Sequence, residues 1–336
     1  MKALRLHAAG DLRFHEEREP IPEAGEELVR VTAVGLCGSD RHWFAEGGIG
    51  DATLDRPLIL GHEIAGVVED GPRRGLRVAV DPADPCQRCE TCLSGHANLC
   101  PGLRFAGHGE TDGGLRTLMA WPRRLLHALP DSIGDAEAAL LESLGIAVHA
   151  AALGEVQPGM SAGVYGCGPI GLLLVQLLHA IGCRPIVATD LLSHRLDAAR
   201  QLGATHAIRT DVETADLPDV EVAFEVAGED AAVADAVRSV RPGGLVVLVG
   251  IPSDDRTSFR ASAARRKGLL LMLCRRMTGR DLPRAIRLVS NGRIDLGALI
   301  SERYPLAAAD AAFAALVERR GLKVLIEPNK GAAPQG

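Results

Sequence analysis

The stretch SAGVYGCGPIGLLLVQLLHAIG, residues 161–182, decides the fold of this chain. It starts with a short apolar run, turns through the glycine-rich GCGPIG, and continues in apolar residues at helical spacing. Glycines let a tight turn approach a pyrophosphate, and the amino terminus of the next helix faces its negative charge. A strand, a G-x-G-x-x-G turn and a helix in this order predict a dinucleotide site, with an ordinary strand–helix turn as the alternative. The predicted contacts are Gly166, Gly168, Pro169, Ile170 and Gly171.

Asp190 ends the next apolar run, PIVATD, nineteen residues after Gly171. A carboxylate at this point would bind the adenosine ribose hydroxyls and repel a 2′-phosphate, so we expect NAD rather than NADP. Arg195 works against that preference, because a guanidinium there would attract a phosphate. The alternative role for Asp190 is to cap the helix that LLSHRLDAAR predicts.

Strands and helices continue to alternate on the carboxyl side of this unit. VEVAFEVAG (220–228), GGLVVLVG (243–250) and LLLMLC (269–274) predict strands, and EDAAVADAVRSVR (229–241) predicts a helix. Repeated βα units with continuous apolar strands predict an α/β fold, in which helices cover both faces of a parallel sheet. The run GGLVVLVGIP, expected near the sheet edge, is a candidate contact between subunits.

The flanking regions follow other patterns. Up to about residue 130, short Val/Ile/Leu runs broken by Gly, Pro and Asp predict a β-rich region. Residues 135–156 show helical spacing, with Asp135 placed to cap the start. After about Met277 we expect two helices and a last strand, KVLIEP, followed by a disordered tail from Asn329.

Composition excludes several classes of function. The 336 residues are 47% hydrophobic and 24% charged, as in a soluble globular protein of two or three domains. A net charge of −6 and only 3% aromatic residues argue against nucleic-acid binding. No run approaches the roughly 18 apolar residues of a membrane helix, and MKALRLHAAGDLRFHEE turns charged before a signal-peptide core could form. We therefore expect a cytoplasmic protein without nucleic-acid or membrane partners.

Four of the eight cysteines form the pattern Cys86-x2-Cys89-x2-Cys92-x7-Cys100. Short loops bring four thiolates around one ion, and a tetrahedron of sulfurs is the usual shell of a structural Zn²⁺ with no open position. Two disulfides or free thiols are the alternatives, which a reducing compartment disfavours for clustered cysteines.

A second set of metal-capable residues is dispersed along the chain. Cys37 lies in GLCGSDRHW, His62 and Glu63 lie in LGHEIAG, and Glu142 lies in LLESLGIAVHA. LGHEIAG is not an H-E-x-x-H motif, because position 66 is glycine. Taken one at a time, these residues also fit a buried apolar thiol, a core histidine and a solvated helix residue.

The motifs GLCGSDRH, LGHEIAG, the four-cysteine pattern, LLESLGIAVHA and GCGPIG occur in the order and approximate spacing of the zinc-containing medium-chain dehydrogenases. The chain resembles the sorbitol (polyol) dehydrogenase branch most closely, over nearly its whole length. The resemblance implies a β-rich GroES-like catalytic domain of residues 1–143 and 277–336, with the structural-zinc lobe at 84–101. A doubly wound Rossmann domain that binds NAD, residues 144–276, is inserted into it.

The resemblance also implies a catalytic zinc that Cys37 and His62 hold, with Glu63 and Glu142 as alternating or water-linked ligands. Adjacent residues of a regular strand point to opposite faces. His62 and Glu63 can therefore share one ion only if the backbone bends, which Gly61 would permit.

Other implied roles surround this zinc. Asp40 would accept the ring N–H of His62. Ser39 would bond to the reacting oxygen and pass its proton through the nicotinamide ribose to His42 and then to water. A surface histidine is the alternative for His42. Candidate pocket walls, for which core packing is the alternative, are Trp43, Phe44, Ile49 and Phe105.

The function that follows is that of a zinc-dependent, NAD-linked alcohol dehydrogenase. It would oxidise a secondary hydroxyl of a polyol-like molecule to a ketone, reversibly, by hydride transfer to nicotinamide. The alternatives are a threonine-type 3-dehydrogenase, a simple secondary-alcohol dehydrogenase and an aminocyclitol dehydrogenase, because GGLRTLMAWP lacks an acidic–aromatic pair usual in the polyol branch. A zinc-free quinone reductase should lack the ligand set, and a non-catalytic relative should have a damaged one. We expect a homodimer or homotetramer.

Overall fold

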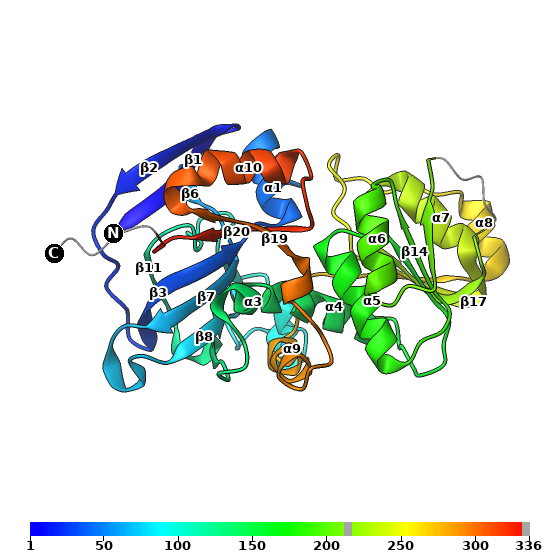
Figure 1. Cartoon of the computed structure of the whole chain (residues 1–336), viewed down its shortest axis with the longest axis horizontal. Helices are drawn as coiled ribbons and strands as arrows, with labels where there is room; N and C mark the ends of the chain where they lie inside the picture. The colour runs from blue at the N-terminus through cyan, green and yellow to red at the C-terminus, as the bar shows by residue number, and fades with distance from the viewer. Residues whose placement is uncertain (212–216, 331–336) are drawn as a thin grey trace. The chain divides into compact units, whose positions relative to one another are not determined.

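The computed structural model describes residues 1–211 and 217–330, and Figure 1 shows its elements. The chain folds into two compact units, the first of Met1–Glu142, Thr278–Ser290 and Asp295–Gly336 and the second of Ser143–Met277 and Asn291–Ile294. These divisions lie one residue from the expected boundaries, and residues 291–294 group with the second unit. Among the described helices, none combines the length and the apolar character that crossing a membrane requires.

The second unit is built on a six-stranded parallel sheet in the order β15-β14-β13-β16-β17-β18. The chain starts in the middle of the sheet, adds two strands on one side, and returns to add three on the other. This is the strand order of a doubly wound Rossmann fold, so the predicted α/β architecture is confirmed. The strands are β13 (Ala162–Tyr165), β14 (Ile186–Asp190), β15 (His206–Arg209), β16 (Val220–Glu225), β17 (Val240–Leu248) and β18 (Leu270–Leu273).

Helices cover this sheet because its central strands are apolar on both faces. β13 is completely buried, as a strand between two helical layers must be. Contacts between α5 and α6 and between α7 and α8 separate the helices into two pairs, and right-handed crossovers place these pairs on opposite faces. Figure 1 shows α5 and α6 together on one side of β14. The helices are α4 (Leu141–Leu153), α5 (Pro169–Ile181), α6 (Ser193–Gln201), α7 (Asp230–Ser239) and α8 (Ala261–Lys267).

The first unit is β-rich. Its main sheet has the order β12-β8-β7-β3-β20-β19, with β11 also pairing with β3, and a smaller sheet has the order β2-β1-β6. The strands are β1 (Lys2–Ala8), β2 (Asp11–Glu16), β3 (Glu26–Gly35), β4 (Gly48–Ile49), β5 (Ala52–Thr53), β6 (Leu58–Ile59), β7 (Glu63–Val68), β8 (Arg77–Val80), β9 (Ala83–Asp84), β10 (Arg104–Phe105), β11 (Leu118–Pro122), β12 (Leu126–Ala128), β19 (Ile300–Pro305) and β20 (Lys323–Glu327). The helices are α1 (Gly38–Glu46), α2 (Glu90–Leu93), α3 (Asp135–Ala139), α9 (Asp281–Ser290) and α10 (Ala309–Val317).

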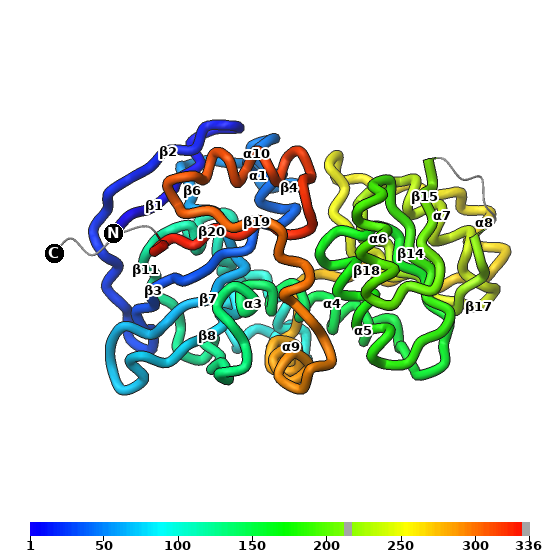
Figure 2. Tube along the Cα trace, in the orientation of Figure 1, coloured from blue at the N-terminus to red at the C-terminus, as the bar shows by residue number. Residues whose placement is uncertain are grey.

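β20 joins the two ends of the chain in one sheet. It pairs antiparallel with β3, with Leu325 opposite Gly35 and Ile326 opposite Val34, and parallel with β19. In Figure 2 the red β20 and the blue β3 lie side by side. Asn329, just beyond β20, donates from its side-chain amide to the carbonyls of Val31 and Thr117. The prediction of disorder from Asn329 is therefore wrong for this residue, whereas residues 331–336 lie outside the described part of the chain.

Two further predictions need correction. Gly134, not Asp135, is the N-cap of α3, because the carboxylate of Asp135 pairs instead with the guanidinium of Arg77 at 2.7–2.9 Å. The helical stretch is also divided at Leu140 into α3 and α4. The run GGLVVLVG lies near the sheet edge, as expected, because β17 is the next-to-last strand, between β16 and β18. The edge strand is β18, within LLLMLC.

Candidate functional site

Three metal-capable side chains come together in the first unit. The ligand atoms of Cys37, His62 and Glu63 lie within 4.8 Å of one another. Cys37 lies between the end of β3 and the start of α1, and Glu63 is the first residue of β7. β3 and β7 pair with Gly35 opposite Glu63, so the register of the sheet brings the two segments together. Glu142, the fourth candidate ligand, is not part of this group.

Gly61 produces the bend that lets His62 and Glu63 share one site. Its φ is +89°, a conformation that glycine adopts without steric penalty. A Cβ atom at this position would also lie 2.7 Å from Cγ1 of Val34. His62 lies outside the regular strand, so the alternation of strand side chains does not separate it from Glu63.

Asp40 holds together the loops that carry Cys37 and His62. Its fully buried carboxylate accepts hydrogen bonds from the backbone N–H groups of Cys37, at 2.9 Å, and Gly61, at 3.1 Å. Oδ1 of Asp40 and Nδ1 of His62 are 3.8 Å apart, too far for a hydrogen bond. The expected bond between these side chains is not formed, because the carboxylate satisfies buried backbone donors instead.

Acidic groups crowd around this cluster. Burial raises the pKa of the Cys37 thiol to about 11 and the pKa of Glu142 to about 8. Burial also raises the pKa of Asp40. A divalent cation would favour the ionised forms of such groups, because an opposite charge nearby stabilises a thiolate or carboxylate. Thiolate, imidazole and carboxylate are donors that zinc accepts, so the residues present fit a zinc ion with one position left open.

Lys323 is a member of this site that the sequence analysis missed. Its Nζ lies 2.5 Å from Oε1 of Glu63, and the two side chains are 1% and 0% exposed. Burial lowers the pKa of Lys323, but Glu63, Cys37 and Glu142 together raise it by more, so the net pKa is raised. The available signal was a lysine at the start of the apolar strand KVLIEP, since lysine is rarely buried without a partner.

α1 carries the residues expected to move a proton. Ser39 and His42 are three positions apart and therefore lie on one side of the helix. Nδ1 of the buried His42 lies 3.0 Å from both carboxylate oxygens of Glu46, one turn further along. Glu46 is a second residue that the sequence analysis missed, although its i+4 spacing from His42 pointed to it. The contact at Nδ1 orients the imidazole and leaves Nε2 for another partner.

The candidate pocket walls divide into two groups. The ring of Phe105 packs against His62, with centroids 5.4 Å apart. Trp43, Phe44 and Ile49 join the hydrophobic core of the first unit, where Phe44 packs on Phe313 at 4.8 Å. Phe105 is therefore the wall residue in contact with the metal-binding cluster, and the core explains the other three.

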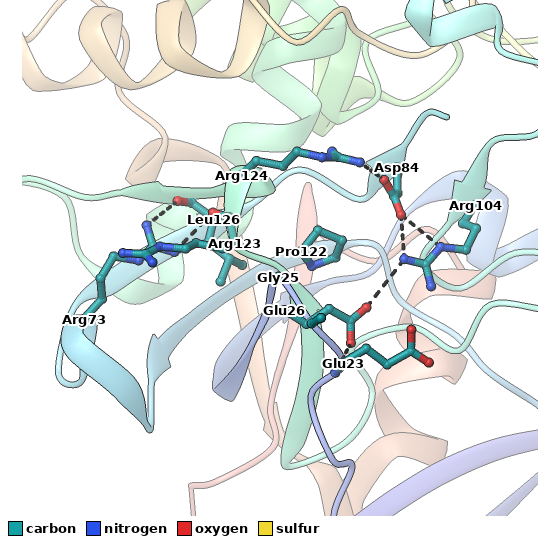
Figure 3. Close-up of a pocket in the computed structure, with 11 residues that line it drawn as sticks. Glu23, Gly25, Glu26, Arg73, Asp84, Arg104, Pro122, Arg123, Arg124 and Leu126 are labelled. Carbon is teal, nitrogen blue, oxygen red and sulfur yellow. Dashed lines mark hydrogen bonds and ion pairs between the residues drawn. The ribbon is translucent and has the colours of Figure 1, made fainter. Parts of the chain in front are cut away.

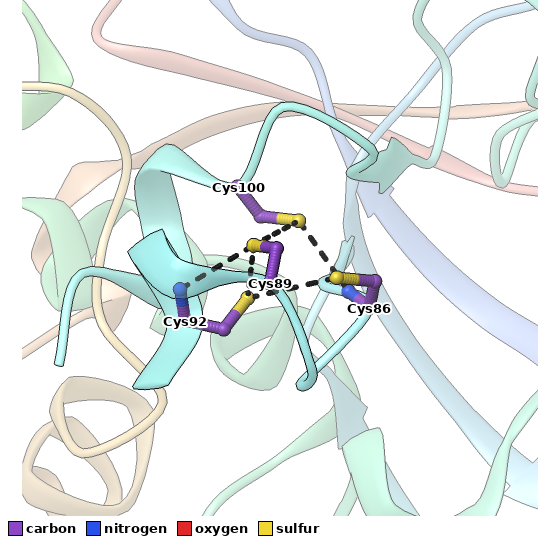
Figure 4. Close-up of side chains that lie close together, drawn as sticks. All are labelled: Cys86, Cys89, Cys92 and Cys100. Atoms are coloured by element: carbon purple, nitrogen blue, oxygen red, sulfur yellow. Dashed lines mark hydrogen bonds between the residues drawn. The ribbon is translucent and has the colours of Figure 1, made fainter. Parts of the chain in front are cut away.

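The four-cysteine lobe forms a second cluster in the first unit (Figure 4). All four thiols are free, and the sulfur of Cys89 lies 3.4 Å from that of Cys92 and 3.8 Å from that of Cys100. The sulfurs of Cys86 and Cys92 are 4.0 Å apart. A tetrahedron with zinc–sulfur bonds of about 2.3 Å has edges of about 3.8 Å, so the cluster fits a structural zinc.

Arginine–carboxylate pairs fix the base of this lobe. Asp84, just before Cys86, accepts hydrogen bonds from Arg124 and, at 2.6 Å, from Arg104. Figure 3 shows these pairs at a pocket of about 760 Å³, which Arg73 also lines. Because the buried Asp84 binds two arginines that lie outside the lobe, these ion pairs hold the lobe to the rest of the unit and account for the charged lining of this pocket.

The glycine-rich loop of the second unit requires its glycines. Gly166 has a φ of +108°, and a Cβ at Gly171 would lie 1.9 Å from the carbonyl oxygen of Gly166. Gly168 is the N-cap of α5, and Pro169 and Ile170 are its first residues. The loop therefore ends at helix N–H groups that have no partner within the helix, which is the geometry that binds a phosphate.

Asp190 lies at the carboxyl end of β14, beside this loop. Its carboxylate accepts hydrogen bonds from the backbone N–H groups of Cys167, at 2.8 Å, and Leu192, at 2.9 Å. A guanidinium nitrogen of Arg195 lies 3.8 Å from Oδ2. Because Leu192 is the N-cap of α6, Asp190 supports the start of that helix as well as the glycine loop.

Glu225, at the end of β16, is a third residue that the sequence analysis missed. Its buried carboxylate accepts hydrogen bonds from the N–H groups of Ala227 and Gly228, both at 2.7 Å. Burial raises its pKa. Tyr165 pairs with Glu225 across the sheet, so this carboxylate shapes the loop next to Gly166. The sequence feature that could have identified Glu225 is its position at the end of the apolar run VEVAFE.

Comparison with known proteins finds a dehydrogenase family match for each of the two units. Residues 23–131 match the alcohol dehydrogenase GroES-like domain, and residues 169–291 match the zinc-binding dehydrogenase family. The chain is 34% identical to sorbitol dehydrogenase of Bacillus subtilis (strain 168), covering 98% of both proteins. It is 34% identical to sorbitol dehydrogenase of Gallus gallus, covering 97% of this chain and 96% of that protein. A zinc-binding dehydrogenase from Sinorhizobium meliloti 1021, solved bound to NADP, superimposes with a TM-score of 0.89 at 28% identity, covering 97% of this chain and 99% of the other.

Gly171→Ala is expected to destabilise the second unit, because its Cβ would meet the Gly166 carbonyl at 1.9 Å. The free energy of unfolding should fall by about 1–3 kcal/mol in denaturant titration, as overpacking does elsewhere. The control is Gly168→Ala, where the nearest atom to a new Cβ is 4.0 Å away. Its unfolding free energy should fall by no more than the roughly 1 kcal/mol that alanine costs at an N-cap, and by less than in Gly171→Ala. Equal effects of the two variants would contradict this account of the loop.

Proposed function

Because the chain belongs to the zinc-containing medium-chain alcohol dehydrogenases, we propose that it oxidises a secondary hydroxyl of a polyol-like small molecule to a ketone, reversibly, with NAD as hydride acceptor. The observation that carries this proposal is the cluster of Cys37, His62 and Glu63, a zinc-type donor set. The sorbitol dehydrogenases among the relatives support the polyol as substrate class.

The first unit would hold the catalytic metal on Cys37 and His62, with Glu63 as the third ligand. A zinc ion bound there would supply Lewis acidity, which lowers the pKa of a ligated hydroxyl towards about 7. Glu142, whose pKa burial raises to about 8, would face this position as the alternating or water-linked partner. Phe105, packed against His62, would exclude water from one side of the reacting carbon.

Residues of α1 would remove the proton that the hydroxyl loses. Ser39 would accept this proton at its hydroxyl oxygen and pass it towards Nε2 of His42. Glu46, bonded to Nδ1, keeps the imidazole in one orientation and stabilises its protonated form. Asp40 would keep the loops of Cys37 and His62 at a fixed separation rather than exchange protons.

The second unit would bind NAD through the glycine loop, from Gly166 to Gly171, and through Asp190. The nicotinamide supplies the hydride acceptor. Arg195 lies 3.8 Å from the Asp190 carboxylate, so the acid offsets the charge that would otherwise attract a 2′-phosphate. This pairing supports NAD over NADP.

The four-cysteine lobe would bind a second, structural zinc through Cys86, Cys89, Cys92 and Cys100. Four sulfurs leave no open position, so this ion would stabilise the lobe without taking part in the reaction. Eight free cysteines suit a reducing compartment, which supports the cytoplasm as the place of action.

We propose a homodimer formed through the edge strand β18. Leu270, Met272 and Leu273 are 66%, 41% and 78% exposed, and β17 occupies the other side of this strand. An apolar sheet edge of this kind is a template for pairing with a second copy about a twofold axis. The molar mass in solution distinguishes this dimer from the alternative homotetramer.

The purified protein is expected to contain two zinc ions per chain and to reduce NAD in the presence of polyols. Cys37→Ser should retain one zinc and lose at least about a thousandfold in kcat, because the catalytic ion supplies several kcal/mol of transition-state stabilisation. Elemental analysis and NADH absorbance measure both, on a panel that includes simple secondary alcohols and threonine. A single zinc confined to the cysteine lobe of fully active protein would refute the mechanism.

His42→Ala is expected to lower kcat by roughly 10²-fold, the usual contribution of a positioned proton acceptor, and to change the pH profile of kcat. Glu46→Gln should have a smaller effect in the same direction. His206→Ala, at an exposed histidine of β15, serves as the control and should behave as the wild type. Full activity and an unchanged pH profile in His42→Ala would remove His42 from the proton path.

Asp190→Ser is expected to lower the ratio of kcat/KM for NAD to that for NADP by at least about tenfold, because it exposes Arg195 to a 2′-phosphate. Asp190→Asn keeps the shape of the side chain without its charge and separates repulsion from loop disruption. Asp197→Ser, at an exposed acid of α6, is the matched control. An unchanged ratio in both Asp190 variants would count against the proposed role.

A further inference from the structure

Lys323 is buried in the first unit although the fold alone requires no charge there. β20 pairs with β3, and the carbonyl of Val324 accepts a hydrogen bond from the N–H of Leu36 at 3.0 Å. This pairing places the first residue of β20 beside the loop of Cys37. Replacing a buried ion pair by apolar residues is often neutral or stabilising. Stability therefore does not account for a buried lysine on Glu63.

Glu63 is held from two sides. Oε1 lies 2.5 Å from the ammonium of Lys323. Oε2 fills the space above Gly35, where a Cβ would come within 2.1 Å of it. In this position the carboxylate also lies within 4.8 Å of the ligand atoms of Cys37 and His62. One carboxylate thus faces both an ammonium group and the candidate metal position.

We propose that Lys323 is a positioning residue that competes with the catalytic zinc for the Glu63 carboxylate and keeps Glu63 a displaceable ligand. This inference rests on the proposed function, which supplies the zinc. An ammonium next to a carboxylate lowers the attraction of that carboxylate for a second cation and also repels the cation directly. A fourth position must stay open for a substrate hydroxyl, and a weakly held carboxylate keeps it accessible.

The charge of Lys323 acts on the whole ligand set. The acidic groups that interact with it are Glu63, Cys37 and Glu142. Asp40, the other buried acid nearby, is bonded to backbone N–H groups. Removing the ammonium would take away a positive charge that competes with the metal for these acids. The zinc would then be held more tightly, whereas loss of a merely structural support would loosen it.

The experiment measures zinc release from the whole protein to an excess of a chromophoric chelator, in the absence of substrate. Lys323→Met is expected to slow release of the catalytic zinc by at least about tenfold. Lys323→Arg, which keeps the charge, should release it within about twofold of the wild-type rate. Lys330→Met removes an exposed lysine beside the same strand and is the matched control. Zinc release from the cysteine lobe serves as an internal reference and should not change.

A second variant keeps the test decisive if Lys323→Met does not fold. Lys323→Gln can still donate a hydrogen bond to Glu63 but has no charge, so it too should slow release. In a Glu63→Gln background the effect of Lys323→Gln should shrink to about threefold or less, because most of it acts through Glu63. The absorption spectrum of cobalt-substituted protein should change in Lys323→Gln and not in Lys323→Arg.

Faster or unchanged zinc release in Lys323→Met and Lys323→Gln would overturn the inference, as would an undiminished effect in the Glu63→Gln background. These outcomes are distinct from a failure of the proposed function. A protein that oxidises no alcohol on the panel would refute the function and leave the release rates to be read independently. Normal activity together with faster release would refute the role of Lys323 alone.

Discussion

The pairing of β3 with β7 on one side and with β20 on the other is the constraint on which the metal centre depends. Cys37 follows β3, Glu63 opens β7 and Lys323 opens β20, so three neighbouring strands bring one residue each to the same region. Glu63 and Lys323 are 260 positions apart in the sequence. The complete centre, with Lys323 beside Glu63, therefore draws on both ends of the chain.

Burial then determines the chemistry of this centre. Cys37 and Glu142 both prefer to be neutral when no metal ion is bound, because burial removes water from around them. A divalent cation reverses that preference and converts the same groups into ligands. Desolvation of these acids is unfavourable for the apo protein, but the same acids can serve as metal ligands. The ammonium of Lys323 offsets part of their negative charge both with and without a metal.

Local patterns in the sequence predicted local structure well. The four cysteines span only fifteen residues, and the glycine loop six, so their spacing alone determines which atoms meet. Long-range partners could not be read in this way. Asp135 is a residue type that commonly caps helices, but its carboxylate pairs with Arg77, 58 positions earlier. Whether β17 or β18 forms the edge of the sheet depends on the order in which these two strands join it. Both are apolar segments, so their sequences do not distinguish the edge strand from its neighbour. Lys323 belongs to the site only through the register of β20.

The two clusters of metal-capable residues differ for the same reason. The cysteine lobe draws all its donors from one segment and is closed, so few changes elsewhere can alter it. The centre of Cys37, His62 and Glu63 draws its donors from the loop after β3 and from the start of β7, and the neighbouring strand β20 contributes Lys323, which changes their charge. In the proposed mechanism this site binds a metal and also releases one of its ligands, and its contact with neighbouring strands allows that release to be adjusted. A site that only holds a fold together needs no such adjustment, and its sequence is correspondingly compact.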